Sequence, residues 1–361
     1  MVAKKAQNNI AKLKNDLGLS NDELYAIAYF IETTVKKPAS KKYRYFKKKE
    51  TKLARSIEYC PEGPHIFIHL KTHGIDMIGR GKSKTVTYSI RYDSITPELV
   101  ANCVIRDTPK ASRKRSIANE TYAAKHLNNL PGICKTYAIT HHAKPDGSKP
   151  QVSFIQKLYS GGTLKSYFDL HKTVPTASLI LLTLDYLCGL KSIHAHDRYH
   201  GDLHLSNLMI DRDTPPFRGV LIDFGRCMDC TEASLFLPVI QAVRQNNPPE
   251  VFSTRAKDID PKAVDIYALG LCLYRIYFQQ EPEWARSKAR FLSTASMNEQ
   301  ELAAFGDLLS SQITQSIAKH RQSAGSNDPF AEMIFMMIDP DPIKRGSIDE
   351  VYELCYSFLS H

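Results

Sequence analysis

Two short segments carry the side chains best suited to chemistry. Residues 200–207 are His-Gly-Asp-Leu-His-Leu-Ser-Asn, and residues 220–225 are Val-Leu-Ile-Asp-Phe-Gly. Phosphoryl transfer needs a carboxylate near the acceptor hydroxyl and oxygen ligands for a hard Mg²⁺ ion. The residue types and their spacing therefore predict that Asp202 acts as the base or orients the acceptor. They also predict that Asn207 and Asp223 hold Mg²⁺ or Mn²⁺.

The two segments resemble the catalytic loop and the Asp-Phe-Gly motif of the protein kinase superfamily, over about residues 65–360. Upstream, residues 78–86 resemble the glycine-rich loop that covers the ATP phosphates. Residues 154–162 resemble the segment that contacts adenine through its backbone, with Gln156 at the gatekeeper position. The resemblance implies an ATP site made of Gly79, Arg80, Gly81, Lys82, Lys84, Val86, Val104, Arg106, Lys157, Tyr159, Met209 and Ile222.

Two departures concern the lysine that usually contacts the ATP phosphates. Arg106 stands where that lysine is expected, and Lys84 replaces the third glycine of the loop. This combination resembles the with-no-lysine kinases, which implies that Lys84 contacts phosphate. Arg106 then assists or holds the helix glutamate, for which Glu120 is the candidate. The alternative is that both cations are solvated and the chain is an ATP-binding pseudokinase scaffold.

A third departure is Gly201, where the kinase pattern has an arginine that receives an activation-loop phosphate. Its absence implies that activation does not need that phosphate and that something else orders the active state.

The segment 200–207 is also typical of aminoglycoside-type and lipid kinases, and His204 in place of lysine favours that alternative. Three downstream segments favour a protein kinase, and we expect its acceptor to be serine or threonine. Pro248-Pro249-Glu250 resembles the end of an activation segment, residues 262–270 resemble the central helix whose Asp265 braces the catalytic loop, and residues 339–345 end at Arg345. The resemblance predicts a buried ion pair between Glu250 and Arg345, and a protein substrate.

Hydrophobic periodicity and turn signals indicate the elements that must position these residues. Strands are expected over about 65–107, a helix over 112–130, two further strands near 134–140 and 152–157, and mainly helices after 162. The fold class is therefore α+β, with a two-lobed kinase-like architecture. We expect a basic, partly helical extension over residues 1–64, a β-rich lobe over 65–158 and a larger α-helical lobe over 159–361.

The net charge of +10 is concentrated near the N-terminus, since residues 1–60 hold 14 Lys/Arg against 6 Asp/Glu. Such a segment favours an anionic partner. Our hypothesis is that an inositol polyphosphate such as inositol hexakisphosphate, or a phosphoinositide headgroup, orders the small lobe and positions Glu120. Contact with a membrane surface is a further option, and nucleic acid is a weaker one. The basic residues expected to bind the anion are Lys41, Lys42, Arg44, Lys47, Lys48, Lys49, Arg113, Lys114 and Arg115.

The composition also bears on the expected core and on the cellular location of the protein. A chain that is 43% hydrophobic and 24% charged is expected to bury a sizeable core. No apolar run is long enough for a membrane span and no signal peptide is visible, so we expect a cytoplasmic protein with reduced cysteines. The basic extension and the aberrant lysine also resemble bacterial secreted effector kinases such as those of Legionella, which would act in a host cytosol.

Overall fold

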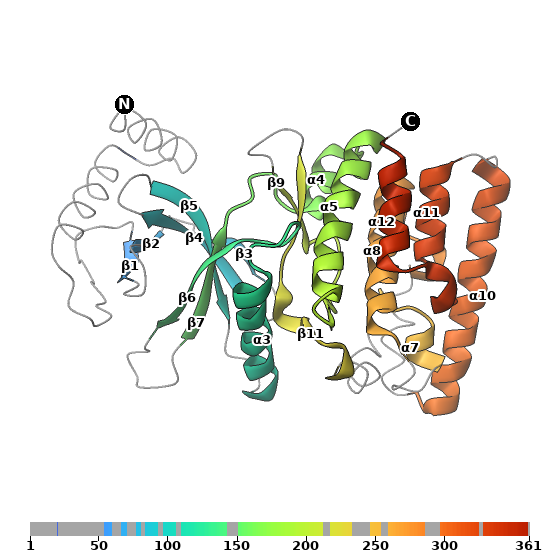
Figure 1. Cartoon of the computed structure of the whole chain (residues 1–361), viewed down its shortest axis with the longest axis horizontal. Helices are drawn as coiled ribbons and strands as arrows, with labels where there is room; N and C mark the ends of the chain where they lie inside the picture. The colour runs from blue at the N-terminus through green and yellow to red at the C-terminus, as the bar shows by residue number, and fades with distance from the viewer. Residues whose placement is uncertain are drawn as a thin grey trace. The chain divides into compact units, whose positions relative to one another are not determined.

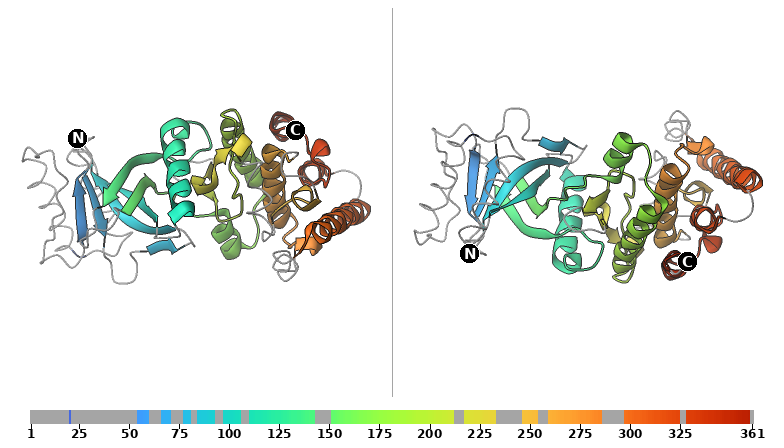
Figure 2. Two further views of the ribbon diagram at one scale, coloured as in Figure 1. Left: turned by 90° about the horizontal axis from the view of Figure 1, so that it is seen from below. Right: turned by 90° about the horizontal axis from the view of Figure 1, so that it is seen from above.

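The computed structural model describes Ser20 and residues 54–59, 66–70, 77–80, 84–92, 97–105, 110–142, 151–211, 217–232, 246–253, 259–285, 297–324 and 328–359. These residues form two compact units (Figure 1). The first contains the described residues up to Ile117 together with Lys135–Leu158, and the second contains Ala118–Cys134 and the described residues from Tyr159 onward. Figure 2 gives two further views of the same elements.

The first unit is built on an antiparallel sheet with strand order β1-β2-β4-β5-β7-β6, and β3 pairs with β4 outside this path. The strands are β1 (Ala54–Tyr59), β2 (Ile66–Leu70), β3 (Met77–Arg80), β4 (Lys84–Tyr92), β5 (Pro97–Ile105), β6 (Thr136–His142) and β7 (Gln151–Lys157). Side chains of β5 alternate between two apolar clusters: Cys103 and Ile105 pack with Phe154, whereas Val100 packs with Phe67. This period-two pattern is what predicted strands here.

The sheet begins earlier than the sequence indicated. Strand β1 lies within the segment assigned to the basic extension, and it pairs with β2 from Ala54↔Leu70 to Tyr59↔Ile66. Its alternation is interrupted by Arg55 and Glu58, which hid the strand among charged residues. The helical part expected in the extension and the basic residues 41–49 lie outside the described residues.

Helix α3 (Lys110–Tyr122) begins in the first unit and ends in the second, where a π-helical turn (Ala123–Leu127) continues it. The other helices of the second unit are α4 (Leu164–His171), α5 (Thr176–His194), α7 (Glu250–Ser253), α8 (Pro261–Tyr277), α10 (Glu299–Ala324), α11 (Pro329–Met337) and α12 (Ile348–Ser357). Short strands β8 (Arg198–Tyr199), β9 (Leu208–Asp211), β10 (Arg218–Leu221) and β11 (Met228–Asp229) lie between α5 and α7 in the chain.

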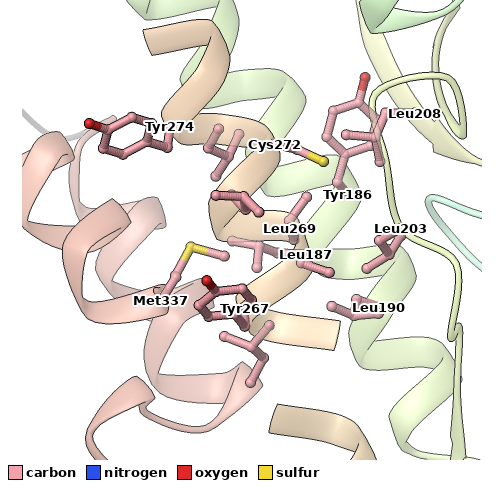
Figure 3. Packing of buried hydrophobic residues seen from close by; sticks show 14 of the residues in the cluster. Tyr186, Leu187, Leu190, Leu203, Leu208, Tyr267, Leu269, Cys272, Tyr274 and Met337 are labelled. Atoms are coloured by element: carbon pink, nitrogen blue, oxygen red, sulfur yellow. The ribbon is translucent and has the colours of Figure 1, made fainter. Parts of the chain in front are cut away.

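Helix α8 is the centre of this unit, with fourteen of its seventeen residues buried. A helix that is apolar on nearly all sides must be surrounded by other elements. Gly270 allows a close approach to α11, because a Cβ there would lie 2.6 Å from the Met337 Cβ. Leu203 and Leu208 pack in the same core as Leu187 of α5 (Figure 3), so the core anchors the chain on both sides of residues 204–207.

Helix α5 is the one helix in the described ranges whose length and mean hydropathy of 1.3 would suit a membrane span. Half of that stretch is buried inside the protein, and α5 packs against α12, β10 and α8. Its apolar composition is that of a core helix.

Candidate active site

Asp265 of α8 holds the start of the loop 200–207. Its carboxylate is 1% exposed and accepts hydrogen bonds from the His200 amide at 2.6 Å and the Gly201 amide at 3.0 Å. His194 Nε2, from the end of α5, lies 3.2 Å from the same carboxylate. Hydrogen bonds to a buried carboxylate are strong, so this brace ties the loop to the two central helices.

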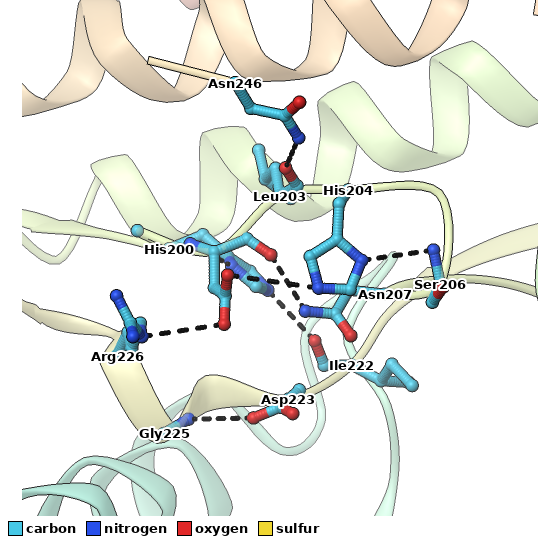
Figure 4. Close-up of polar contacts among 12 residues, drawn as sticks. His200, Leu203, His204, Ser206, Asn207, Ile222, Asp223, Gly225, Arg226 and Asn246 are labelled. Atoms are coloured by element: carbon cyan, nitrogen blue, oxygen red, sulfur yellow. Dashed lines mark hydrogen bonds and ion pairs between the residues drawn. The ribbon is translucent and has the colours of Figure 1, made fainter. Parts of the chain in front are cut away.

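His200 connects the two chemistry-bearing segments (Figure 4). The Asp202 amide donates to its Nδ1 at 3.3 Å, and its Nε2 lies 3.0 Å from the Ile222 carbonyl. An amide can only donate and a carbonyl can only accept, so these partners require a neutral imidazole protonated at Nε2. The ring is fully buried and packs against Phe224, with ring centroids 5.4 Å apart.

A β-hairpin brings Asn207 and Asp223 to the same place. Strands β9 and β10 pair with Leu208 opposite Leu221, and the Ile222 amide donates to the Asn207 carbonyl at 3.1 Å. Asn207 directly precedes β9, and Asp223 lies two residues after the end of β10. Both side chains emerge at the open end of the hairpin, next to the loop that carries Asp202.

The side chains at this end form a mainly oxygen donor set. Asn207 Nδ2 donates to the Asp202 carbonyl at 2.8 Å, which fixes the orientation of the side-chain amide. Asp223 has the left-handed backbone conformation (φ 67°, ψ 70°), and its carboxylate accepts from the Gly225 amide at 3.4 Å. An amide oxygen and a carboxylate are ligands that Mg²⁺ and Mn²⁺ accept, so the donor chemistry fits the predicted metal.

Cationic and polar groups surround Asp202, whose side chain is 20% exposed. Arg226 Nε lies 3.6 Å from one carboxylate oxygen, and His204 Nε2 lies 3.9 Å from the other. Asn246 donates to the Leu203 carbonyl at 2.9 Å (Figure 4). Arg275 of α8 in turn donates to the Asn246 side-chain oxygen at 2.9 Å. Arg226, Asn246 and Arg275 were missed by sequence reasoning because their partners are distant in the chain.

In the first unit, the predicted glycine-rich segment is the β3–β4 hairpin. Gly79 pairs with Val86 and Arg80 with Thr85, and Lys84 is only 8% exposed. Gly81, Lys82 and Arg106 lie outside the described residues.

The register of β4 and β5 places two of the predicted ATP-site residues, Val86 and Val104, on different faces. Val86 pairs with Cys103 and Lys84 with Ile105, whereas Val104 pairs with Thr85. Directly paired residues share a face, so Val86 and Val104 lie on opposite faces and cannot both pack on one side of an adenine ring. Lys84 and Val86 share their face with Cys103, whose thiol donates to the Gln156 amide oxygen at 3.1 Å.

The remaining candidate residues are distributed over both units. Lys157 ends β7 and is half-buried, Tyr159 is 7% exposed, and Met209 and Ile222 are partly buried against the helical core. Glu120 of α3 is 2% exposed in the second unit. Of the α3 basic residues, Arg113 and Arg115 are half-buried and Lys114 is exposed.

Cys227 and Cys230 follow the Asp-Phe-Gly segment in the chain. Burial raises the pKa of each to about 12, so both remain protonated at neutral pH. Among the residues that the structure describes, no group of three or more His, Cys, Asp or Glu side chains could hold a metal ion by itself.

Glu250 and Arg345 form the ion pair that the resemblance predicted. The guanidinium contacts the two carboxylate oxygens at 2.5 and 2.7 Å, and Arg345 is fully buried. Arg345 also donates to the carbonyls of Asp339 at 2.7 Å and Ala263 at 3.3 Å. The pair therefore joins the first residue of α7 to the turn that precedes α12.

A comparison with family models agrees with this geometry. Residues 72–357 match the protein kinase domain, which covers most of the chain. The chain belongs to the protein kinase family. The β-rich first unit and the helical second unit are thus the small and large lobes of the two-lobed kinase fold, as predicted.

Similar kinases include the meiosis-specific serine/threonine-protein kinase mek1 of Schizosaccharomyces pombe, at 27% identity over 194 residues (51% of this chain, 42% of that protein). The serine/threonine-protein kinase Wnk of Drosophila melanogaster is 26% identical over 208 residues (57% and 8%), and a probable serine/threonine-protein kinase WNK5 of Oryza sativa subsp. japonica is 26% identical over 133 residues (36% and 38%). The chain spans less than half the length of each of these relatives.

Proposed function

We propose that this chain is an ATP-dependent protein kinase that transfers the γ-phosphoryl group to serine or threonine hydroxyls, with Mg²⁺ or Mn²⁺. The observation that carries the proposal is the convergence of Asp202, Asn207 and Asp223 at the end of the β9–β10 hairpin. This is the arrangement that the chemistry requires, with a carboxylate for the acceptor beside oxygen ligands for the metal. The likeness to kinases described as serine/threonine-specific supports the choice of acceptor.

In the proposed reaction the acceptor oxygen attacks the γ-phosphorus, and the bond from that phosphorus to the β–γ bridging oxygen breaks to release ADP. Asp202 orients the hydroxyl and takes its proton. Asn207 and Asp223 would hold the metal, which would offset the negative charge of the phosphates. Lys84, buried in the sheet of the first unit, is proposed to contact phosphate in place of the lysine usual in the family.

A protein acceptor is favoured over a small molecule by the Glu250–Arg345 pair. Small-molecule kinases with a similar His-Gly-Asp loop generally lack the activation-segment end and the late arginine that form this pair. Here the pair is fully formed and holds the segment that follows the activation loop.

The test is transfer of radiolabelled γ-phosphate by the purified chain, with Mg²⁺ or Mn²⁺, to itself and to a generic protein substrate. We expect protein labelling on serine or threonine that is lost in Asp202→Ala and Asp223→Ala. Nucleotide binding without turnover would indicate a pseudokinase instead. ATP consumption without protein labelling would indicate a small-molecule kinase.

We also infer that the basic residues bind a polyanion such as inositol hexakisphosphate. Support comes from the clustering of positive charge before residue 60 and from Arg113, Lys114 and Arg115 on α3. Titration with inositol hexakisphosphate at low and high NaCl is the test, and we expect affinity to fall with salt. Binding that is absent, or that does not change with salt, would contradict this inference.

A further inference from the structure

The chain has no room for a side chain at position 201. Gly201 has φ +69°, which L-residues rarely adopt, and a Cβ there would lie 2.8 Å from the Tyr199 ring. An arginine at this position would be strained and would clash. A side chain that orders the residues after Asp223 must therefore come from another position in the chain.

Three consecutive residues that follow Asp223 and Phe224 are each held by a different element. Asn119 of α3 donates to the Gly225 carbonyl at 3.1 Å, and Arg226 lies 3.6 Å from the Asp202 carboxylate. Arg198 of β8 donates from Nη1 to the Cys227 carbonyl at 2.8 Å. All these contacts are made by unmodified side chains of the second unit.

Arg198 contacts more of the surrounding elements than Asn119 or Arg226 does. Its guanidinium carbon lies 3.5 Å from the centroid of the Tyr122 ring at the end of α3, which is a close cation–π contact. The Tyr122 ring also contacts His126, with ring centroids 4.5 Å apart. One arginine thus connects α3 and the strand that leads into the catalytic loop with the residues that follow Asp223.

Backbone pairing aligns the same two segments but does not involve α3. Strand β11 pairs with β8 through Met228↔Tyr199 and Asp229↔Arg198, and the Cys230 amide donates to the Asp197 carbonyl at 2.9 Å. The Arg198 side chain extends this pairing by one residue toward Asp223 and ties it to Tyr122.

We propose that Arg198 is a positioning residue: it holds the start of the activation segment, and through it Asp223, without phosphorylation of that segment. This proposal deepens the proposed function and rests on it. Arg198 does not touch the reacting atoms. It acts by limiting the positions that Cys227, and hence the backbone back to Asp223, can adopt.

The test compares Arg198→Met with Tyr122→Leu, which removes the ring but leaves the arginine, and with Tyr122→Phe, which keeps the ring. Lys262→Met is the matched control, because Lys262 pairs with Asp197 beside the same strand but does not contact residues 225–227. Each protein is checked for folding by its melting curve and then assayed for kcat and for KM of ATP. Amide hydrogen exchange of residues 227–230 is measured on the same samples.

We expect Arg198→Met and Tyr122→Leu to lower kcat by about 10- to 100-fold, because small misplacement of reacting groups costs that much. KM for ATP should change less than kcat, exchange at 227–230 should accelerate, and Tyr122→Phe and Lys262→Met should resemble the parent protein. The parent protein should keep its kcat after phosphatase treatment. If Arg198→Met does not fold, Tyr122→Leu carries the comparison.

The proposal is overturned if folded Arg198→Met keeps kcat within about twofold, or if phosphatase treatment inactivates the parent protein. Failure of the proposed function is distinguishable, since hydrogen exchange does not depend on turnover. A parent protein that transfers no phosphate refutes the kinase activity. In that case faster exchange at 227–230 in Arg198→Met still supports the positioning role of Arg198, and unchanged exchange overturns it.

Discussion

Removal of the Arg345 side chain is the sharpest test of how the large lobe is held together. In Arg345→Met the Glu250 carboxylate loses both of its guanidinium contacts while it remains 7% exposed. Loss of one partner of a buried pair leaves an uncompensated charge and costs about 3–5 kcal/mol of unfolding free energy. The loss of the hydrogen bonds to the Asp339 and Ala263 carbonyls places the expected value toward the upper end.

Equilibrium urea unfolding followed by circular dichroism measures this change, with a fall in melting temperature of roughly 6–20 °C as a second readout. Arg321→Met is the control, since the Arg321–Glu332 pair has the same chemistry but its side chains are 54% and 48% exposed. An exposed pair contributes about 0–1 kcal/mol.

The double variant Arg345→Met with Glu250→Leu separates the charge from the packing. Removal of both charges leaves no buried ion, so we expect the double variant to be more stable than Arg345→Met alone. Arg345→Lys should restore little, because one ammonium cannot reproduce the two parallel contacts. If Arg345→Met costs no more than Arg321→Met, the reasoning about this buried pair is wrong.

Three further predictions concern the same lobe. Gly270→Ala should lower the unfolding free energy by about 1–3 kcal/mol in urea titrations, because the added methyl overlaps Met337, and an unchanged midpoint would contradict the close packing. Burial lowers the pKa of His320 below 6.5 and its Nε2 lies 2.6 Å from the Tyr274 hydroxyl, so the unfolded chain takes up its proton first as pH falls. Unfolding free energy should therefore decrease as pH falls through about 6.5, and this decrease should be smaller in His320→Gln; an equal decrease in both proteins would refute it. Burial raises the pKa of Cys230 to about 12, so iodoacetamide at pH 8 should label it far more slowly in the native protein than in urea, and equal rates would show that the thiol is not protected.

Much of the active site could be predicted from short-range pattern. The spacing of Asp202, Asn207 and Asp223 predicted that these residues act together, and the β9–β10 hairpin agrees with this. The late motif that ends at Arg345 predicted the pairing with Glu250, which the structure contains. These residues are recognisable because phosphoryl-transfer chemistry restricts residue type and spacing along a continuous stretch of chain.

Other contacts could not be predicted, because they depend on elements that meet only in the folded chain. Arg198 and Tyr122 are ordinary residues in the sequence, 76 positions apart, and become a contact when α3 packs beside β8. Nothing in the local pattern of either residue indicates the other.

The sequence by itself indicated the candidate catalytic residues, the α+β class and the order of the two lobes, since these follow from residue type, spacing and periodicity. Only the tertiary structure decided which face of a strand each side chain occupies and which distant groups meet. Val104 illustrates the reason: a shift of one position in strand register moves a side chain to the opposite face, and register is set by the pairing of β4 with β5 rather than by either strand alone.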